Sequence, residues 1–477
     1  MPGRALPARA RGARAEGTIL IVTLWIILAL VGLLLTLARA MRVEAQCSAN
    51  GVSAAQAAAV EQGAVQYVLS RLATLDGEVP DEANTPCQAV RVGSGAFWVL
   101  RCDGDGQNYS YGITDEASKV NLNTASLDML SMLPNMTADL AASIADWRDA
   151  DDTITPGGAE SEYYLMLEEP YEAKNAPLET VGELGLLKEM TPDVAIWEDT
   201  NRNGFLDENE NDGAVLDPND NSDGHLDRGP YAFSTVYSAE PAAGASGTPA
   251  VDVNTASREA LTNAFRNALS PDRLAIIVDR VALNRPFTNI IDFYAKCGLT
   301  MDEFRLLIDS VTVGPATSGP SSGPTNGPAG AGLARGKINV NTAPREVLAC
   351  LGQLTETDVQ ALLDWRADAS HDLSTIAWII EALPKTNGAP AKAVAIGGLI
   401  TTRTYQFSAD IVALSGDGRA FRRCRIVVDL ASSLTPRVVY WQDLTGLGWP
   451  LDAAIIDQLR AGAAMDKVLQ ESGQKVK

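Results

Sequence analysis

An uncharged segment near the N-terminus constrains this chain more than any other feature. The 21 residues from Thr18 to Ala38 (TILIVTLWIILALVGLLLTLA) contain no charged side chain. A helix needs about 20 apolar residues to span a bilayer, whereas the apolar core of a cleaved secretory signal has only about 7 to 15. The segment therefore predicts a membrane-spanning helix. Arginines precede it and a mostly acidic chain follows it, so the positive-inside tendency predicts a cytoplasmic N-terminus.

The helical pattern continues beyond this segment. Apolar residues recur close to a three-four spacing on one face, at Val60, Ala64, Tyr67, Val68, Leu72 and Leu75. An apolar helix that runs into an amphipathic half, behind a basic leader ending in Gly, resembles a type IV prepilin. The resemblance implies cleavage by a prepilin peptidase after Gly17, which makes Thr18 the new N-terminus. That family usually has Glu at the fifth mature position, where this chain has Val22, and the lack of Glu suits a subunit at a filament tip.

Charge and histidine content argue against several classes of function. The chain has 38 Lys and Arg against 60 Asp and Glu, a net charge of −22, which repels a nucleic-acid backbone. It has only two histidines, His225 and His371, and we find neither a Ser/His/Asp arrangement nor an HExxH motif. We therefore expect a protein that is not an enzyme and does not bind nucleic acid.

Four short segments predict strands. They are Phe97 to Cys102, Tyr109 to Thr114, Tyr405 to Leu414 and Phe421 to Leu430. Helical patterns dominate the long region between the second and third segments, apart from two linker-like stretches at 240–250 and 314–336. This order predicts an α+β fold in which a large all-α domain is inserted into a pilin-like α/β domain with a small antiparallel sheet.

A repeated phrase marks the helical region. It reads VNLNTASLDML from Val120, VDVNTASREAL from Val251 and INVNTAPREVL from Ile338. Asp-Trp-Arg follows the first and third copies, and Asp279 and Arg280 take that place after the second. The phrase resembles SAM-like or helix-hairpin-helix modules, some of which bind DNA phosphates through a Gly-rich hairpin. Only Gly352 lies near the required place here, without a basic cluster, so the repeats favour a structural scaffold.

Longer phrases are similar to one family, the minor pseudopilin K of type II secretion (general secretion pathway protein K). They are DEASKVNLNTA from Asp115, ADWRDADD followed by GGAESEYY, KNAPLETVGEL from Lys174, and RIVVDL with VVYW near the C-terminus. The resemblance covers Gly17 to about Pro450. It implies a place at the tip of the periplasmic pseudopilus, above the major pseudopilin, in a complex with minor pseudopilins I and J and with H beneath them.

The expected division of the chain follows from these features. We expect a leader at 1–17, a transmembrane helix at 18–38, a pilin-like domain in two parts at 39–116 and 401–450, and a C-terminal tail at 451–477. The inserted α-domain covers 117–400, with repeats that start near 119, 251 and 337 and an acidic insert at 197–230.

Part of the acidic insert has the pattern of an EF-hand. In DTNRNGFLDENE, oxygen-bearing side chains fall at loop positions 1, 3, 5, 9 and 12, which are Asp199, Asn201, Asn203, Asp207 and Glu210. Gly204 takes position 6, and Phe205 at position 7 would offer its carbonyl. A weaker second copy has Asn219, Asn221, Asp223 and Asp227 at positions 1, 3, 5 and 9, but Pro230 at position 12, with Asp217 as a substitute ligand. We expect structural calcium here, against the alternative of a solvated acidic loop. The acidic run at Asp149, Asp151 and Asp152 is interpreted as a solvated helix end.

Six cysteines are present, at Cys47, Cys87, Cys102, Cys297, Cys350 and Cys424. An even number in an oxidising compartment fits disulfides. We predict a Cys87–Cys102 disulfide, because the short separation would close a loop onto a strand, and favour Cys297–Cys350 less.

The sequence as a whole predicts a single-pass inner-membrane protein with most of its chain in the periplasm. We interpret it as a tip subunit that initiates and caps the pseudopilus for export of folded proteins across the outer membrane. Two alternatives stay open: a DNA-uptake or type IV pilus minor pilin that binds DNA through its repeats, and a membrane-anchored periplasmic hydrolase.

Overall fold

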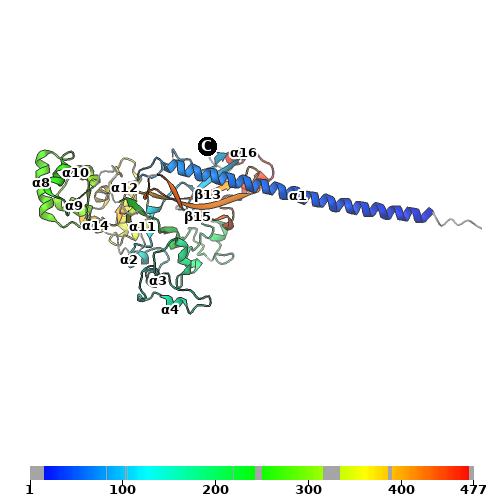
Figure 1. Ribbon diagram of the computed structural model, residues 1–477, viewed down its shortest axis with the longest axis horizontal. Coiled ribbons are helices and arrows are strands. Elements are labelled where there is room, and N and C mark those ends of the chain that lie inside the picture. The colour runs from blue at the N-terminus through cyan, green and yellow to red at the C-terminus, as the bar shows by residue number, and fades with distance from the viewer. Residues whose placement is uncertain are drawn as a thin grey trace, which may run out of the picture.

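A single long helix organises the molecule. The computed structural model describes residues 16–81, 83–102, 104, 106–218, 220–241, 250–314, 333–384, 389–433 and 435–471. Helix α1 (Glu16–Leu72) has 57 residues, and its first half projects from the folded part (Figure 1). Every large apolar side chain from Ile19 to Leu37 is at least 47% exposed, and α1 is long and apolar enough to cross a membrane. The predicted continuation of the apolar helix is confirmed.

A seven-stranded antiparallel sheet packs against the second half of α1. Its main order is β1-β2-β13-β14-β15, and the short strands β3 and β4 pair with β2 and β13. All four predicted strand segments join this sheet, as the sequence predicted. The strands are β1 (Val90–Val92), β2 (Gly95–Arg101), β3 (Ser110–Tyr111), β4 (Thr114–Asp115), β13 (Gln406–Leu414), β14 (Phe421–Asp429) and β15 (Arg437–Asp443).

Both faces of the sheet are covered. Val60, Ala64 and Val68 of α1 pack on one face, against a core that includes Phe407 and Ile426. Two polar contacts hold α1 in register: Glu61 Oε2 pairs with Arg422 Nε at 2.8 Å, and Ser53 Oγ donates to Asp417 Oδ2 at 2.7 Å.

The expected C-terminal tail is part of the fold. Helices α15 (Ala453–Arg460) and α16 (Met465–Glu471) cover the other face of the sheet, over Trp98 and Val412. Ile455, Ile456 and Leu459 give α15 an apolar stripe, which explains why this segment packs on the sheet.

Three repeats form the inserted domain, and each closes with a two-residue parallel ladder. The first repeat contains β5 (Val120–Asn121), α2 (Leu127–Ser131), α3 (Ala138–Arg148), α4 (Ser161–Tyr164), α5 (Pro192–Ala195), α6 (Pro230–Phe233) and β6 (Ser234–Thr235). The second contains β8 (Val251–Asp252), α7 (Arg258–Phe265), α8 (Pro271–Asn284), α9 (Ile290–Cys297), α10 (Met301–Leu307) and β9 (Val311–Thr312). The third contains β11 (Ile338–Asn339), α11 (Arg345–Ala349), α12 (Glu356–Ala367), α13 (Trp378–Ala382), α14 (Ala389–Ile396) and β12 (Ile400–Thr401).

The second repeat has a core of its own, whereas the first and third share one. It is inserted between β7 (Ala239–Pro241) and β10 (Leu333–Arg335), which pair antiparallel at its base. Helix α8 lies at the end of the molecule opposite the free half of α1, while α3 and α4 lie in a lobe that projects sideways (Figure 1).

The repeated phrase forms hydrogen bonds that tie together distant segments of its repeat. In the first repeat the Asn123 side chain donates to the Leu178 carbonyl at 2.9 Å and accepts from the Leu178 N–H at 2.8 Å. Arg148 donates to the carbonyls of Leu122 and Ala125. Arg366 makes the equivalent bonds in the third repeat. Each arginine thus ties a later segment of its repeat to the start of that repeat.

In the second repeat the clamping arginine is not the one that the sequence suggested. Arg285 donates to the carbonyls of Val253 and Ala256, at 2.6 and 2.7 Å. Arg280 instead donates to the Cys297 carbonyl at 2.8 Å. The clamping arginine lies farther from the repeated phrase in this copy than in the other two. The spacing in those two copies therefore pointed to the wrong arginine.

Buried acids attach the inserted domain to the sheet. Asp115 Oδ2 accepts from Asn339 Nδ2 at 2.8 Å and from Thr342 Oγ1 at 2.6 Å, which joins the sheet to the third repeat. Glu116 accepts from Ser408 Oγ at 2.6 Å and from Thr235 of the first repeat. The first and third repeats are therefore anchored at one junction.

Candidate functional site

The first acidic loop brings its predicted oxygen donors together. The two carboxylate oxygens of Asp199 accept from the backbone N–H groups of Asn203 at 2.9 Å and Gly204 at 3.2 Å. The side-chain amides of Asn201 and Asn203 both donate to Asp207 Oδ2, at 2.6 and 3.0 Å. Gly204 has a φ of +71°, and an added Cβ would lie 2.7 Å from Cys102 Cα, so only glycine fits there.

Glu210 closes this loop. Its carboxylate accepts from the Thr200 N–H at 3.2 Å and from the Asp207 N–H at 3.1 Å. Phe205, predicted to act through its carbonyl, stacks its ring on Tyr109 with centroids 4.5 Å apart. The structure therefore gathers all five predicted ligand side chains into one loop.

An arginine of the sheet holds the first acidic loop in place. Arg423 of β14 is fully buried and donates to the carbonyls of Asn201 at 2.6 Å and Arg202 at 2.7 Å. The same guanidinium forms a two-bonded pair with Asp410 of β13, at 2.8 and 2.9 Å. The pilin-like sheet and the acidic insert are therefore one structural unit at this point.

The second acidic loop uses a residue that sequence reasoning missed. Glu198 is 1% exposed, and its carboxylate accepts from the Asn221 N–H at 3.4 Å and the Asp227 N–H at 2.8 Å. These bonds parallel those of Glu210 in the first loop. The second loop has no acid at position 12, and Glu198 makes the corresponding bonds instead. Because Glu198 precedes the first loop in sequence, the EF-hand spacing of the second loop could not reveal it.

The other predicted members of the second loop are described only in part. Asp217, expected as the substitute, is exposed, and its carbonyl accepts from Asn209 at 3.1 Å. Asn219 lies outside the described residues. Asp223 accepts from the His225 N–H at 2.8 Å, and Asn221 Nδ2 donates to Asp227 at 3.0 Å.

Burial makes three carboxylates at the two loops, those of Glu198, Asp199 and Glu210, costly to ionise. It raises the pKa of Asp199 and of Glu198, and together with the Asp199 charge it raises the pKa of Glu210 to about 8. Within the described residues, no group of three or more His, Cys, Asp or Glu is arranged to hold a metal ion. The loops nevertheless offer carboxylates, amides and carbonyls, which are oxygen ligands of the class that calcium accepts.

A buried carboxylate lies near the acidic run that follows α3. Glu160, at the start of α4, is 3% exposed, and both of its carboxylate oxygens are buried without a hydrogen-bond partner. Burial, followed by the charges of Asp146, Asp149, Asp152 and Asp151, raises the pKa of Glu160 to about 7. The acidic run itself fits the predicted solvated helix end, since Asp151 and Asp152 are exposed, but it lies near a buried carboxylate.

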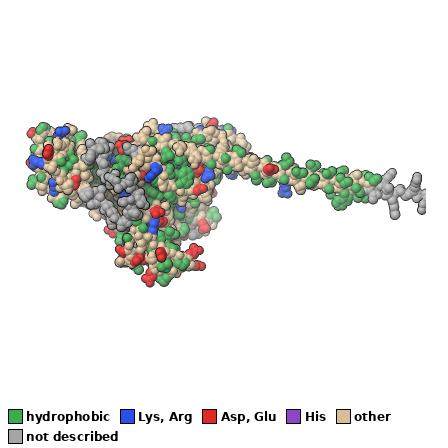
Figure 2. Space-filling view, viewed as in Figure 1, with side chains coloured by type: hydrophobic (Ala, Val, Ile, Leu, Met, Phe, Trp, Pro, Cys, Tyr) green, Lys and Arg blue, Asp and Glu red, His purple; other side chains and the backbone are tan. Residues whose placement is uncertain are grey.

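Asp146 lies close to the chain segment that precedes Glu160. It is fully buried, and its carboxylate accepts from the Thr155 N–H at 3.1 and 3.2 Å. A Cβ at Gly158 would lie 2.1 Å from Asp146 Oδ2, so the backbone approaches that oxygen as only glycine allows. Figure 2 shows acidic side chains gathered on the lobe of α3 and α4.

The predicted Cys87–Cys102 disulfide is not formed. All six cysteines lie in the described part of the chain, and no disulfide joins any of them, so Cys297–Cys350 is not formed either. Cys87 packs in the core between α1 and the sheet. Cys102 instead lines a cavity beside the acidic insert, where its Sγ donates to the Arg202 carbonyl at 2.9 Å. The two thiols therefore occupy different environments, although their short separation in sequence suggested a bridge.

The remaining predicted sites differ in how far the structure describes them. Gly17 and Thr18 lie in the first turn of α1, and residues 1–15 of the leader lie outside the described residues. At the start of α12, where a helix-hairpin-helix module would bind phosphate, Asp358 Oδ2 accepts from the Thr355 N–H at 2.8 Å and pairs with Lys392. This helix end is occupied by the chain's own carboxylate, which favours a structural role for the repeat.

Comparisons with known proteins point to one family. Residues 113–195 match the family model of type II secretion system protein K. A solved structure of the GspK-GspI-GspJ complex from the type 2 secretion system of enterotoxigenic Escherichia coli is similar over 84% of this chain and 98% of its own, with 12% identity and a TM-score of 0.41. No curated protein matches. The family resemblance predicted from the sequence is confirmed by the model match.

Proposed function

We propose that this chain, a type II secretion minor pseudopilin by its match to protein K over residues 113–195, forms the tip of the pseudopilus and starts its assembly. One observation carries the proposal: a helix with an exposed apolar half continues directly into a broad folded head. The apolar half suits first a membrane and then the packed helices of a filament.

The shape of the head supports a capping role. The first and second repeats extend beyond the sheet, one sideways and one away from the free half of α1 (Figure 1). A filament subunit is followed by another subunit stacked above it, and a head of this width would obstruct such stacking. The chain would therefore start a filament without being incorporated into its shaft.

Its partners in this proposal are the minor pseudopilins I and J, with H and the major pseudopilin below. They would contact α1 through its exposed apolar half. The proposal also puts the N-terminus in the cytoplasm and the head in the periplasm, because arginines precede the apolar segment and an acidic chain follows it. Its chemistry is assembly rather than catalysis.

Calcium is proposed as a structural ion of the head. In the first loop Asp199, Asn201, Asn203, Asp207 and Glu210 would hold it, and in the second Glu198 would join Asn221, Asp223 and Asp227. The amide oxygens of Asn201 and Asn203 accept from the backbone N–H groups of Asn203 at 3.0 Å and Phe205 at 2.8 Å, so both side chains would have to turn toward the ion to bind it. The ion would supply the positive charge that buried carboxylates require.

The Asp146–Glu160 cluster fits the same ion. A buried carboxylate with no hydrogen-bond partner calls for an ion or water, because each unsatisfied charged oxygen is costly. In this cluster calcium would offset the repulsion among Asp146, Glu160 and the neighbouring acidic run.

Processing at the leader provides the test of the proposed function. The full chain, co-expressed with a prepilin peptidase and extracted from membranes, should begin at Thr18 with a methylated amine, as mass spectrometry would detect. A Gly17→Leu variant should keep Met1, while a Gly51→Leu variant, in the middle of α1, should be processed normally. An intact leader in the unmodified chain would contradict the proposal and would indicate an ordinary membrane-anchored protein.

A further inference from the structure

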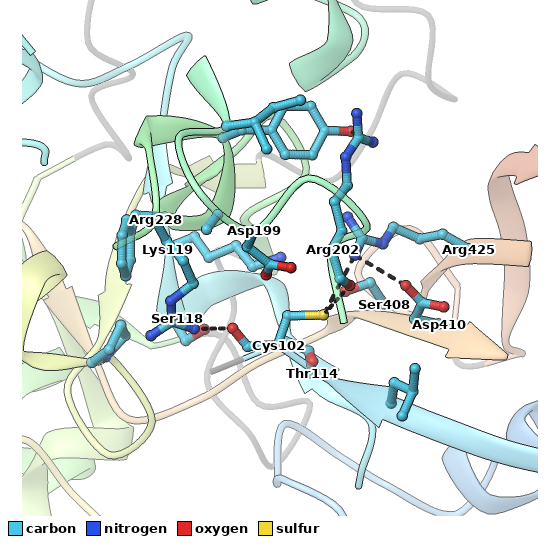
Figure 3. A pocket seen from close by; sticks show the side chains of 16 residues that line it. Cys102, Thr114, Ser118, Lys119, Asp199, Arg202, Arg228, Ser408, Asp410 and Arg425 are labelled. Atoms are coloured by element: carbon cyan, nitrogen blue, oxygen red, sulfur yellow. Dashed lines mark hydrogen bonds and ion pairs between the residues drawn. The ribbon is translucent and has the colours of Figure 1, made fainter. Parts of the chain in front are cut away.

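A cavity of about 70 Å³ lies where the sheet, the first repeat and the acidic insert meet (Figure 3). Its walls come from segments that are distant in sequence. Ser408 and Asp410 belong to β13 and Arg425 to β14, whereas Lys119 precedes β5 and Arg228 belongs to the insert. Any molecule bound there would contact all three parts of the head at once.

Positive charge dominates the lining. Four cationic side chains and only two carboxylates line the cavity. Figure 3 shows Lys119 and Arg425 extending into it from opposite sides. The cations are Lys119, Arg202, Arg228 and Arg425, and the carboxylates are Asp199 and Asp410. This is unusual in a chain with a net charge of −22.

The two carboxylates are already occupied by other donors. Asp410 is paired with Arg423 and also accepts from Arg425 Nη2 at 3.2 Å. Asp199 accepts from two backbone N–H groups of its own loop. Lys119 has its own partner in Glu116, at 2.7 Å. Arg228 lies near enough to Asp199 for the two charges to offset each other in part, whereas Arg202 forms no ion pair with either lining carboxylate.

One N–H donor of the Arg202 guanidinium has no hydrogen-bond partner. Its guanidinium stacks on the ring of Tyr231 at 4.3 Å, and its Nη1 donates to the Tyr231 hydroxyl at 3.1 Å. Its Nε is buried without a hydrogen-bond partner. Arg228 is held nearby, with Nη1 donating to the Cys102 carbonyl and the guanidinium 5.4 Å from the Phe233 ring. Both guanidinium planes are thus positioned by contacts other than ion pairs.

The size of the cavity suits a small polyatomic ion. A water molecule needs roughly 10 to 15 Å³ of such space, so 70 Å³ corresponds to about five water-sized positions. One tetrahedral oxyanion has four oxygens around a central atom and fills a similar volume. Guanidinium groups bind such oxygens through paired N–H donors, which makes arginine the usual residue in oxyanion sites.

We propose that this cavity binds one tetrahedral oxyanion, sulfate or phosphate, through Arg202, Arg228 and Arg425. The bound ion accepts from guanidinium N–H groups, among them the unpartnered Nε of Arg202, and balances the excess positive charge. Because the arginines come from the insert and from the sheet, the anion ties the acidic insert to the pilin-like domain. This site adjoins the first acidic loop, because Asp199 and Arg202 line the cavity, but it would bind its ion through cationic N–H donors rather than through oxygen ligands.

Sulfate binding to the full chain in detergent, with calcium present throughout, tests the proposal. Isothermal titration calorimetry at constant ionic strength, with chloride as the exchanged anion, should give a saturable heat for one ion per chain. Phosphate should compete for the same site. Arg228→Gln should weaken binding about tenfold or more, since a charge-assisted hydrogen-bonded contact is lost.

Control variants separate a site from general salt effects. Lys467→Gln removes an exposed cation on α16 and should leave sulfate binding unchanged. If Arg228→Gln does not fold, by circular dichroism, Arg228→Lys keeps the charge but loses the paired donors and should bind sulfate more weakly than the unmodified chain. An absence of saturable heat, or equal binding by the unmodified chain and a folded Arg202→Gln/Arg228→Gln variant, would overturn the proposal.

Discussion

Replacing Glu160 by Gln should stabilise the protein without calcium and remove part of its stabilisation by calcium. The substitution keeps the size of a 3%-exposed side chain but removes a charge whose oxygens have no hydrogen-bond partner. The lost charge lies near Asp146 and the acidic run after it, so its removal also relieves repulsion.

The pKa shift gives the magnitude. Folding raises the pKa of Glu160 from 4.5 to about 7, and each unit corresponds to about 1.4 kcal/mol. The ionised carboxylate therefore costs roughly 3 kcal/mol of unfolding free energy at about pH 8. The sign follows from the raised pKa: the penalty is absent below 4.5, grows with pH and is complete above about 7. Calcium at about a hundred times its dissociation constant would stabilise the folded chain by about 2.7 kcal/mol, which nearly offsets this penalty.

Urea unfolding of the full chain in detergent at about pH 8, with EGTA or with calcium, measures both effects. In EGTA, Glu160→Gln should be up to about 3 kcal/mol more stable than the unmodified chain, and in calcium this advantage should shrink or reverse. Glu162→Gln, at an exposed position of the same helix, should change neither value. An equal gain in both buffers would rule out calcium at this cluster, and no gain in EGTA would mean that the carboxylate is not desolvated as described.

Three further substitutions or deletions test other parts of the account. Arg423→Gln strands the buried Asp410 carboxylate and should lower the free energy of unfolding by about 3 to 5 kcal/mol in urea, whereas a loss under about 1 kcal/mol would mean that neighbouring groups compensate. Arg273 lowers the pKa of Glu303 to about 2, so the pair stabilises the fold above about pH 4.5 and loses this effect as the pH falls toward 2. After allowance for partial exposure, Glu303→Gln should cost about 1 kcal/mol at neutral pH and nothing near pH 2, and a constant cost by thermal unfolding would refute the assignment. Replacing residues 242–332 with a short turn between the paired β7 and β10 should leave the helical and strand content of the remainder intact by circular dichroism, and global unfolding would show that the second repeat is not a separable module.

The sequence predicted the features that depend on local pattern. The apolar run from Thr18 to Ala38 and the three-four spacing after it gave α1, and alternating apolar runs gave the central strands β13 and β14. The contacts within the first acidic loop were predictable because its five polar side chains lie within twelve residues, whereas calcium binding there stays a prediction.

Features that depend on contacts between distant segments were missed. Glu198 completes a loop that begins some twenty residues later, and Arg285 replaces Arg280 because the second repeat spaces its clamp differently. The burial of Glu160 follows from packing around the α3–α4 lobe, which a run of acids in the sequence does not reveal. The expected Cys87–Cys102 bridge failed for the same reason, since sequence separation does not tell on which side of a sheet a thiol lies.

The central claim is the proposal that this chain starts a filament in company with minor pseudopilins. The most direct measurement is native mass spectrometry of the full, processed chain co-purified from membranes with minor pseudopilins I and J. The account predicts a complex that contains one copy of each protein and no second copy of this chain. Recovery of the chain alone, or of assemblies in which it stacks on itself, would contradict the claim.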